Sequence, residues 1–164
     1  CKQNHEDLLD LVEQPGEDHK EAGTDGGTSA HSIQVEQYRA NRRIILLDVV
    51  RTDFNATPIP YLGLDSGRKV DDDARALGVH DHVSKAEYLN AEHKRSAKYM
   101  AKLLLCYSVH DPETGYCQGM TDLMQPFIHV FHEEAFSFWT FTNFMKNARE
   151  NFRTDEAGIM TKIE

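Results

Sequence analysis

The sequence lacks the long apolar runs and paired cysteines that mark membrane and secreted proteins. No stretch approaches the roughly 20 consecutive apolar residues that a membrane-spanning helix needs, and the run 44–47, for example, ends at Asp48. The three cysteines, Cys1, Cys106 and Cys117, are odd in number and widely spaced, which argues against a disulfide framework. We therefore expect a soluble globular protein from a reducing, cytoplasmic compartment.

Motifs for nucleotide and metal chemistry are also missing. The phosphate-binding loop Gly-x4-Gly-Lys-Ser/Thr does not occur, since Gly63 and Gly67 are one residue too close and are followed by Arg68 and Lys69. Nine histidines are present, but none belongs to a His-Glu-x-x-His motif, and no Cys-x2-Cys pair occurs. We expect the chain to hold no nucleotide, metal or other cofactor of its own.

Acidic residues outnumber basic ones, with 27 Asp and Glu against 18 Lys and Arg, a net charge of −9. This balance disfavours nucleic acid and acidic lipid as ligands and favours a protein partner. Residues 1–33 hold eight acidic residues against two lysines, together with several glycines. We predict a flexible acidic lead-in over 1–33, with one short helix over 8–12, and a folded domain over 34–164. Because the chain begins without Met or an apolar leader, we expect a fragment rather than a secreted precursor.

Apolar spacing predicts helices through most of the folded part. The run 44–50 is rich in β-branched residues and suits a strand or a helix, but the polar residues 36–43 before it favour a helix. Residues 53–90 contain scattered Pro and Gly, and we predict an irregular excursion with one short helix over 72–77.

Three helices are predicted after residue 90. In the first, apolar residues recur from Ala97 to Leu105 at helical spacing, while Lys94, Lys98 and Lys102 line another face. The segment 111–115 then forms a turn. A second helix over 120–131 is expected to be kinked or shortened by Pro126, and a third over 133–145 is expected to be buried on most sides by its aromatic residues. With no strand predicted after residue 90, we expect an all-α fold.

Two short motifs carry candidate functional residues. Ile45, Asp48 and Arg51 recur at intervals of three, so Ile45 can anchor the segment while the Asp48 carboxylate orients the guanidinium of Arg51. Tyr116, Gln118 and Gly119 lie where the turn enters a helix, and backbone there can approach a partner closely. Taken singly, an arginine after an apolar helix is usually a surface cation and a lone glutamine is usually solvated. Their co-occurrence favours function.

These motifs resemble those of the TBC domains that act as GTPase-activating proteins for Rab GTPases. The Ile-x-x-Asp-x-x-Arg motif of that family matches Ile45 to Arg51, its Tyr-x-Gln motif matches Tyr116 to Gln118, and the similarity extends over about 35–152. The resemblance implies the N-terminal, catalytic half of a helical TBC domain. Arg51 and Gln118 are 67 residues apart, further than we expect for the family, so the excess is assigned to an insertion within 53–90.

The resemblance also implies a mechanism. Arg51 would be an arginine finger and Gln118 a glutamine finger, with Ile45, Asp48, Tyr116 and Gly119 as positioning residues. The partner would be a Rab-type GTPase in its GTP-bound form that carries the GTP and Mg²⁺. The chain would then be an activator acting in trans rather than an enzyme, cytoplasmic and brought to endomembranes, in vesicle trafficking, through that partner.

Two alternatives are kept. The first is a catalytically silent helical scaffold that binds a GTPase or an effector without accelerating hydrolysis. The second is a redox-sensitive thiol protein, which would need Cys106 or Cys117 to be exposed and acidified.

Overall fold

The computed structural model describes residues 30–54, 64–131, 133–149 and 152, without the side chains of residues 30 and 64–67. All secondary-structure elements in this part of the chain are helices, which confirms the predicted all-α class. In chain order they are α2 (Ala30–Val49), α3 (Leu64–Ala76), α4 (His80–Ser84), α5 (Ala91–His110), α6 (Met120–Val130) and α7 (Glu134–Ala148).

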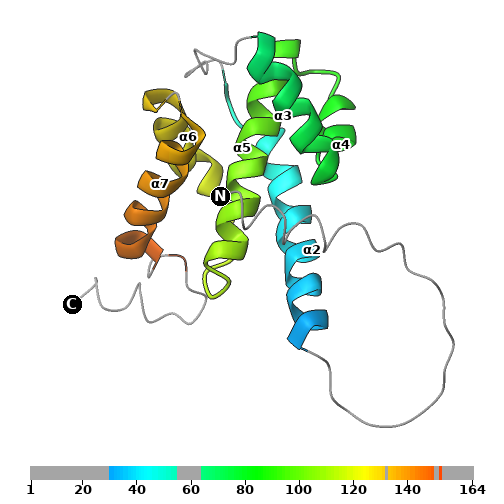
Figure 1. Ribbon diagram of the computed structural model, residues 1–164. Helices are drawn as coiled ribbons and strands as arrows, with labels where there is room; N and C mark the ends of the chain where they lie inside the picture. Colours follow the sequence, from blue (N-terminus) through cyan, green and yellow to red (C-terminus); the bar gives the residue numbers. More distant parts are fainter. Residues whose placement is uncertain (1–29, 55–63, 132, 150–151, 153–164) are drawn as a thin grey trace, which may run out of the picture.

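Helix α5 is the centre of the bundle and contacts every other helix of the described part. Figure 1 shows α2, α3 and α4 on one side of it and α6 and α7 on the other. The side chain of Asn90 caps its first turn by accepting a hydrogen bond of 2.8 Å from the backbone N–H of His93. Every residue from Ser96 to Ser108 is buried, because helices cover α5 on several sides.

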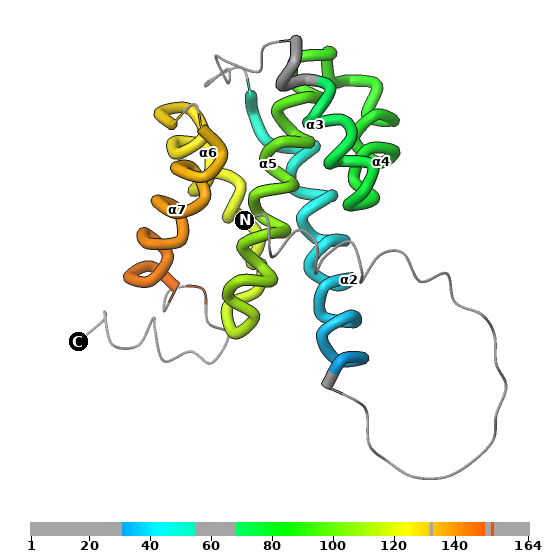
Figure 2. The backbone as a smooth tube through the Cα atoms, viewed as in Figure 1, coloured from blue at the N-terminus to red at the C-terminus, as the bar shows by residue number. Residues whose placement is uncertain are grey.

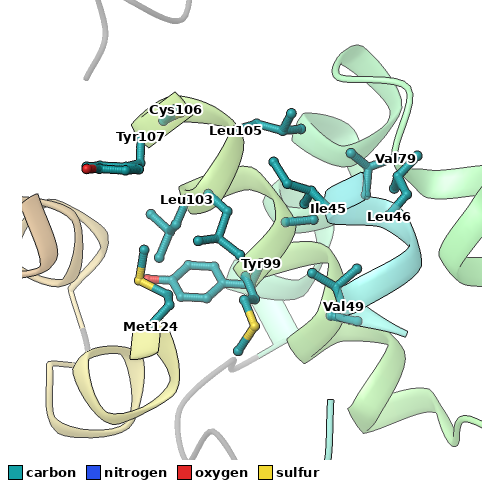
Figure 3. Close-up of a cluster of buried hydrophobic side chains, with 14 of the residues drawn as sticks. Ile45, Leu46, Val49, Val79, Tyr99, Leu103, Leu105, Cys106, Tyr107 and Met124 are labelled. Carbon is teal, nitrogen blue, oxygen red and sulfur yellow. The ribbon is translucent and has the colours of Figure 1, made fainter. Parts of the chain in front are cut away.

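The hydrophobic core lies between α5 and its neighbours. Ile45 and Val49 of α2 are completely buried, and Figure 3 shows them between α2 and α5, with Leu46 beside Val79. On the far side of α5, Met124 of α6 and Phe141 of α7 are also fully buried. The helical interpretation of the run 44–50 is therefore right, since α2 continues to Val49.

Helix α2 begins at Ala30, so residues 30–33, which the sequence placed in the acidic lead-in, belong to a helix. The rest of that lead-in, including the short helix expected over 8–12, lies outside the described residues. Figure 2 shows the N-terminal part of α2 diverging from α5.

The predicted irregular excursion over 53–90 is wrong for 64–76 and 80–84, while residues 55–63 lie outside the described residues. Helices α3 and α4 occupy 64–76 and 80–84, and both pack on α5. Val70, Ala74 and Leu77 supply the buried face, at spacings of four and three residues that are typical of a helix. Three acidic residues lie between these apolar positions, and a glycine with a φ of 63° follows them at position 78. Both features obscure the helical pattern in the sequence.

The three lysines of α5 share one face of the helix, as the sequence predicts, and that face packs against α3 and α4. Lys98 and Lys102 are only 6% and 4% exposed, because acidic side chains cover them. Lys98 donates to Asp71 at 2.7 Å, and Lys102 donates both to Asp73 of α3 and, at 2.7 Å, to Glu134 of α7. Burial lowers the pKa of Lys102, but the two carboxylates outweigh that effect and raise it. Lys102 thus ties three helices together.

The structure narrows one expectation for the last helices and corrects another. Of the two effects expected of Pro126, a kinked or a shortened helix, shortening is excluded, since α6 continues to Val130. Helix α7 buries Phe138, Phe141 and Met145 on one side only. Its other aromatic residues, Phe136, Trp139 and Phe144, remain 57%, 51% and 40% exposed.

Replacing Lys102 by Met is expected to lower the free energy of unfolding by about 3 kcal/mol, because Asp73 and Glu134 would be left facing each other without their cation. Urea denaturation followed by circular dichroism measures the change. Lys146→Met, at an exposed lysine of α7, is the matched control and should stay within about 0.5 kcal/mol of the unmodified chain. Equal losses in the two variants would contradict the bridging role of Lys102.

Candidate functional site

The carboxylate of Asp48 joins the two predicted motifs. Its Oδ2 accepts a hydrogen bond of 2.6 Å from the hydroxyl of Tyr116 and another of 3.0 Å from the backbone N–H of Gly119. The donors lie 68 and 71 residues further along the chain. Hydrogen bonds to an ionised acceptor are stronger than neutral ones, so this contact holds the Tyr-x-Gln turn against the end of α2.

Arg51 lies in the turn that follows α2. Its backbone N–H donates to the carbonyl of Asp48 at 2.9 Å, and the hydroxyl of Thr52 donates to the same carbonyl at 3.2 Å. Val50, Thr52 and Phe54 are buried, whereas Arg51 is exposed. The guanidinium therefore extends into solvent from a backbone that buried neighbours fix on both sides.

The sequence predicted that the Asp48 carboxylate orients the guanidinium of Arg51, and the structure links the two residues in another way. Within the described part of the chain its carboxylate contacts Tyr116 and Gly119, and the link to Arg51 runs through the backbone. A single residue connects both candidate fingers, one by its side chain and the other by its carbonyl.

Gln118 lies between two anchored neighbours. Tyr116 is buried, Gln118 is exposed, and Gly119 forms the N-terminal boundary of α6 with a φ of 93°. Residues with a Cβ rarely adopt this conformation, so glycine at this position directs the chain from the turn into the helix. The amide of Gln118 is presented at the surface immediately beside the N–H that Asp48 holds.

Helix α2 supports the same turn at two further positions, which sequence reasoning missed. The side-chain amide of Gln37 donates to the carbonyl of Pro112 at 2.6 Å. Buried Asn41 packs so closely on Gly115 that a Cβ there would lie 3.2 Å from its Nδ2. The positions 37, 41 and 48 share one side of a helix, and this spacing is the signal that could have identified them.

Asp111 closes the turn from within. Its carboxylate accepts hydrogen bonds from the Tyr107 hydroxyl at 3.0 Å and from the Thr114 hydroxyl at 2.8 Å. Burial raises the pKa of Asp111, but these hydrogen bonds and the nearby Arg149 outweigh it and lower the pKa. The carboxylate is therefore stabilised in its ionised form, as expected for a turn-closing residue.

The raised pKa of Tyr116 suits its role as a hydrogen-bond donor. Burial raises the pKa of its phenol, and the hydrogen bond and charge of Asp48 raise it further. Tyr116 therefore stays protonated and donates to Asp48 throughout the physiological range. The last predicted residue, Ile45, is completely buried below Asp48 in the core, which agrees with an anchoring position.

The two described cysteines are poorly suited to thiolate chemistry. Burial raises the pKa of the Cys106 thiol to about 11 and also raises that of Cys117. A reactive cysteine needs a lowered pKa, so these environments argue against the thiol alternative.

Neither a metal site nor a membrane-spanning helix occurs among the described residues. Among them, no group of three or more His, Cys, Asp or Glu side chains could hold a metal ion. No helix of this part of the chain is both long and apolar enough to cross a membrane.

Replacing Asp48 by Ala is expected to lower the free energy of unfolding by about 2 kcal/mol, because the Tyr116 hydroxyl and the Gly119 N–H would lose their acceptor. Tyr116→Phe removes one of the two bonds and should cost about 1 kcal/mol. Chemical denaturation of both variants measures the difference. A larger loss for Tyr116→Phe than for Asp48→Ala would show that the carboxylate is not the centre of this contact.

Comparison with known proteins shows which proteins this chain resembles. Rab GTPase-activating protein 22 of Arabidopsis thaliana is 37% identical over 140 residues, which are 82% of this chain and 25% of that protein. GTPase-activating protein GYP7 of Candida glabrata is 32% identical over 116 residues, 71% of this chain and 14% of that protein. TBC1 domain family member 25 of Homo sapiens is 29% identical over 155 residues, 94% of this chain and 18% of that protein.

The chain thus spans a quarter or less of the length of these relatives. No solved structure matches it. The family model of the Rab-GTPase-TBC domain matches residues 79–164, a segment that includes Gln118 and does not include Arg51. Because that match covers more than half of the 164 residues, the chain belongs to the Rab-GTPase-TBC domain family.

Proposed function

We propose that this chain accelerates GTP hydrolysis by a small GTPase of the Rab type, supplying Arg51 and Gln118 to the partner's active site. The observation that carries the proposal is the Asp48 carboxylate, which connects the segments bearing the two residues. The names of the relatives support the reaction class, since one is a Rab GTPase-activating protein and another a GTPase-activating protein.

Arg51 has the properties that an arginine finger needs. GTP hydrolysis develops negative charge on the phosphate oxygens in the transition state, and an inserted guanidinium stabilises that charge. The exposed side chain of Arg51 extends from a backbone held by buried Val50 and Thr52. This support fixes the backbone that carries the guanidinium before the partner binds, which reduces the entropy cost of positioning the cation.

Gln118 supplies the complementary group. Its amide carries one acceptor and two donors on a single plane, so it can orient the water that attacks the γ-phosphate. The amide is exposed beside Gly119, whose N–H is held by Asp48. Asp48, Tyr116, Gly119 and Ile45 act as positioning residues in this proposal.

In this mechanism GTP and Mg²⁺ belong to the partner in its GTP-bound form. The chain is an activator that contributes residues in trans and does not hydrolyse GTP by itself. Its place of action is the cytoplasmic surface of endomembranes, where the GTPase partner brings it. A silent scaffold on the same fold would bind the GTPase and leave its hydrolysis rate unchanged.

Single-turnover GTP hydrolysis by a panel of Rab GTPases tests the proposal. Adding the chain should accelerate hydrolysis by at least one member. Arg51→Ala should slow that accelerated hydrolysis by about 10³- to 10⁵-fold. Arg51→Lys should be nearly as damaging, because an ammonium lacks the planar fork of the guanidinium. Gln118→Ala should lose about 10²-fold or more.

Arg68→Ala, at an exposed arginine of α3, and Gln34→Ala, at an exposed glutamine near the start of α2, are the matched controls and should keep the full rate. Binding without acceleration across the whole panel would favour the scaffold. Full activity in Arg51→Ala would refute the arginine finger.

A further inference from the structure

Helix α2 carries an apolar stripe on the side opposite to its core face. Ile33, Ile44 and Leu47 are 53%, 41% and 44% exposed, and Ala40 between them is also exposed. With 100° of rotation per residue, these four positions fall within an arc of roughly 60°. We call this set the outer stripe.

The outer stripe leads to Arg51. The spacing from residues 33, 40, 44 and 47 to residue 51 keeps one side of a helix, and the N–H of Arg51 bonds back to the Asp48 carbonyl, so the chain is still turning there. The opposite side of α2, with Tyr38, Ile45 and Val49, is buried. One helix therefore has an apolar side in the core and another beside the candidate arginine finger.

The outer stripe lies close enough to Arg51 for one partner to contact both. A helix rises 1.5 Å per residue, so Leu47 and Ile44 lie roughly 6 Å and 10 Å from Arg51 along the axis. A protein interface covers about 800 Å² on each partner, which corresponds to a disc of roughly 16 Å radius. An interface centred near Arg51 therefore includes both side chains.

The charge of α2 fits the same partner. Residues 30–51 hold four arginines against Glu36 and Asp48, a local net charge of +2 in a chain whose net charge is −9. A GTPase loaded with GTP presents a negatively charged triphosphate to the protein that inserts an arginine. The turn that bears Gln118 also lies along this side of α2, since Gln37, next to the outer stripe, holds Pro112.

We infer that the outer stripe binds the GTPase partner, with Ile44 and Leu47 supplying apolar contact beside the arginine finger. The inference rests on the proposed function and adds the surface that determines affinity. Single exposed apolar residues are common on proteins, but here they are aligned with one another and with Arg51. The larger aromatic face of α7 is less informative, because nothing in the structure shows what covers it.

The test is the double substitution Ile44→Ser with Leu47→Ser. It should raise KM for the GTP-bound GTPase by about 10-fold or more and leave kcat within about two-fold. The Kd for the same GTPase loaded with a non-hydrolysable GTP analogue should rise in parallel. Tyr88→Ser, in the turn before α5, and Val130→Ser, at the end of α6, replace side chains that are 71% and 61% exposed and should change neither constant.

A labelling experiment serves as a second measurement. A Leu47→Cys variant should react rapidly with a maleimide in the free chain and slowly when the analogue-loaded GTPase is added. This readout does not depend on the double variant folding normally. Labelling that is equally fast with and without the partner would overturn the inference.

The other outcomes separate the inference from the proposed function. Unchanged KM and Kd in the double variant, in a chain that accelerates hydrolysis, would overturn the outer stripe and leave the function standing. A chain that binds but does not accelerate would overturn the function, and a loss of that binding in the double variant would still support the stripe. If the chain binds no GTPase, both fail. A dimer that the double substitution converts to a monomer in sedimentation would instead make the stripe a contact between copies.

Discussion

The arrangement of the candidate site depends on one carboxylate, that of Asp48. It accepts hydrogen bonds from Tyr116 and Gly119, which follow the long helix α5 in the sequence, whereas Asp48 precedes it. An ionised acceptor shared by two donors has a strong geometric preference, and burial keeps Tyr116 in its donating form. This contact joins the end of α2 to the beginning of α6, and Gln125 of α6 adds a second link by donating to the carbonyl of Asp53 at 2.9 Å.

Buried charge plays a similar part along α5. Lys98 and Lys102 would be costly to bury alone, but Asp71, Asp73 and Glu134 compensate them. Some of the acidic excess of the chain is therefore used inside the bundle, where it attaches α3 and α7 to the central helix. Helix α5 thus packs against α2 and α6, which carry the candidate site, as well as against the helices of residues 64–84.

Helix α2 combines these requirements in a single element. Its inner side packs in the core, Asn41 and Asp48 hold the turn that bears Gln118, and the end of the helix presents Arg51. A displacement of this helix would change the arginine, the glutamine and the outer stripe together. This arrangement couples the proposed binding surface to the proposed chemistry through rigid packing rather than through a flexible loop.

The sequence by itself determined the features that depend on local spacing: the all-α class, the helices around Ile45 and Ala97, and the two short motifs. A helix satisfies its backbone hydrogen bonds within its own segment, so its periodicity is readable without knowledge of its neighbours. Only the tertiary structure decided what covers each face. It buried Lys98 and Lys102, exposed Phe136 and Trp139, made 64–84 mostly helical, and gave the Asp48 carboxylate to Tyr116 and Gly119 instead of the Arg51 guanidinium. Those outcomes depend on contacts between residues far apart in the chain, and spacing along one segment carries no information about the partner that packs against it.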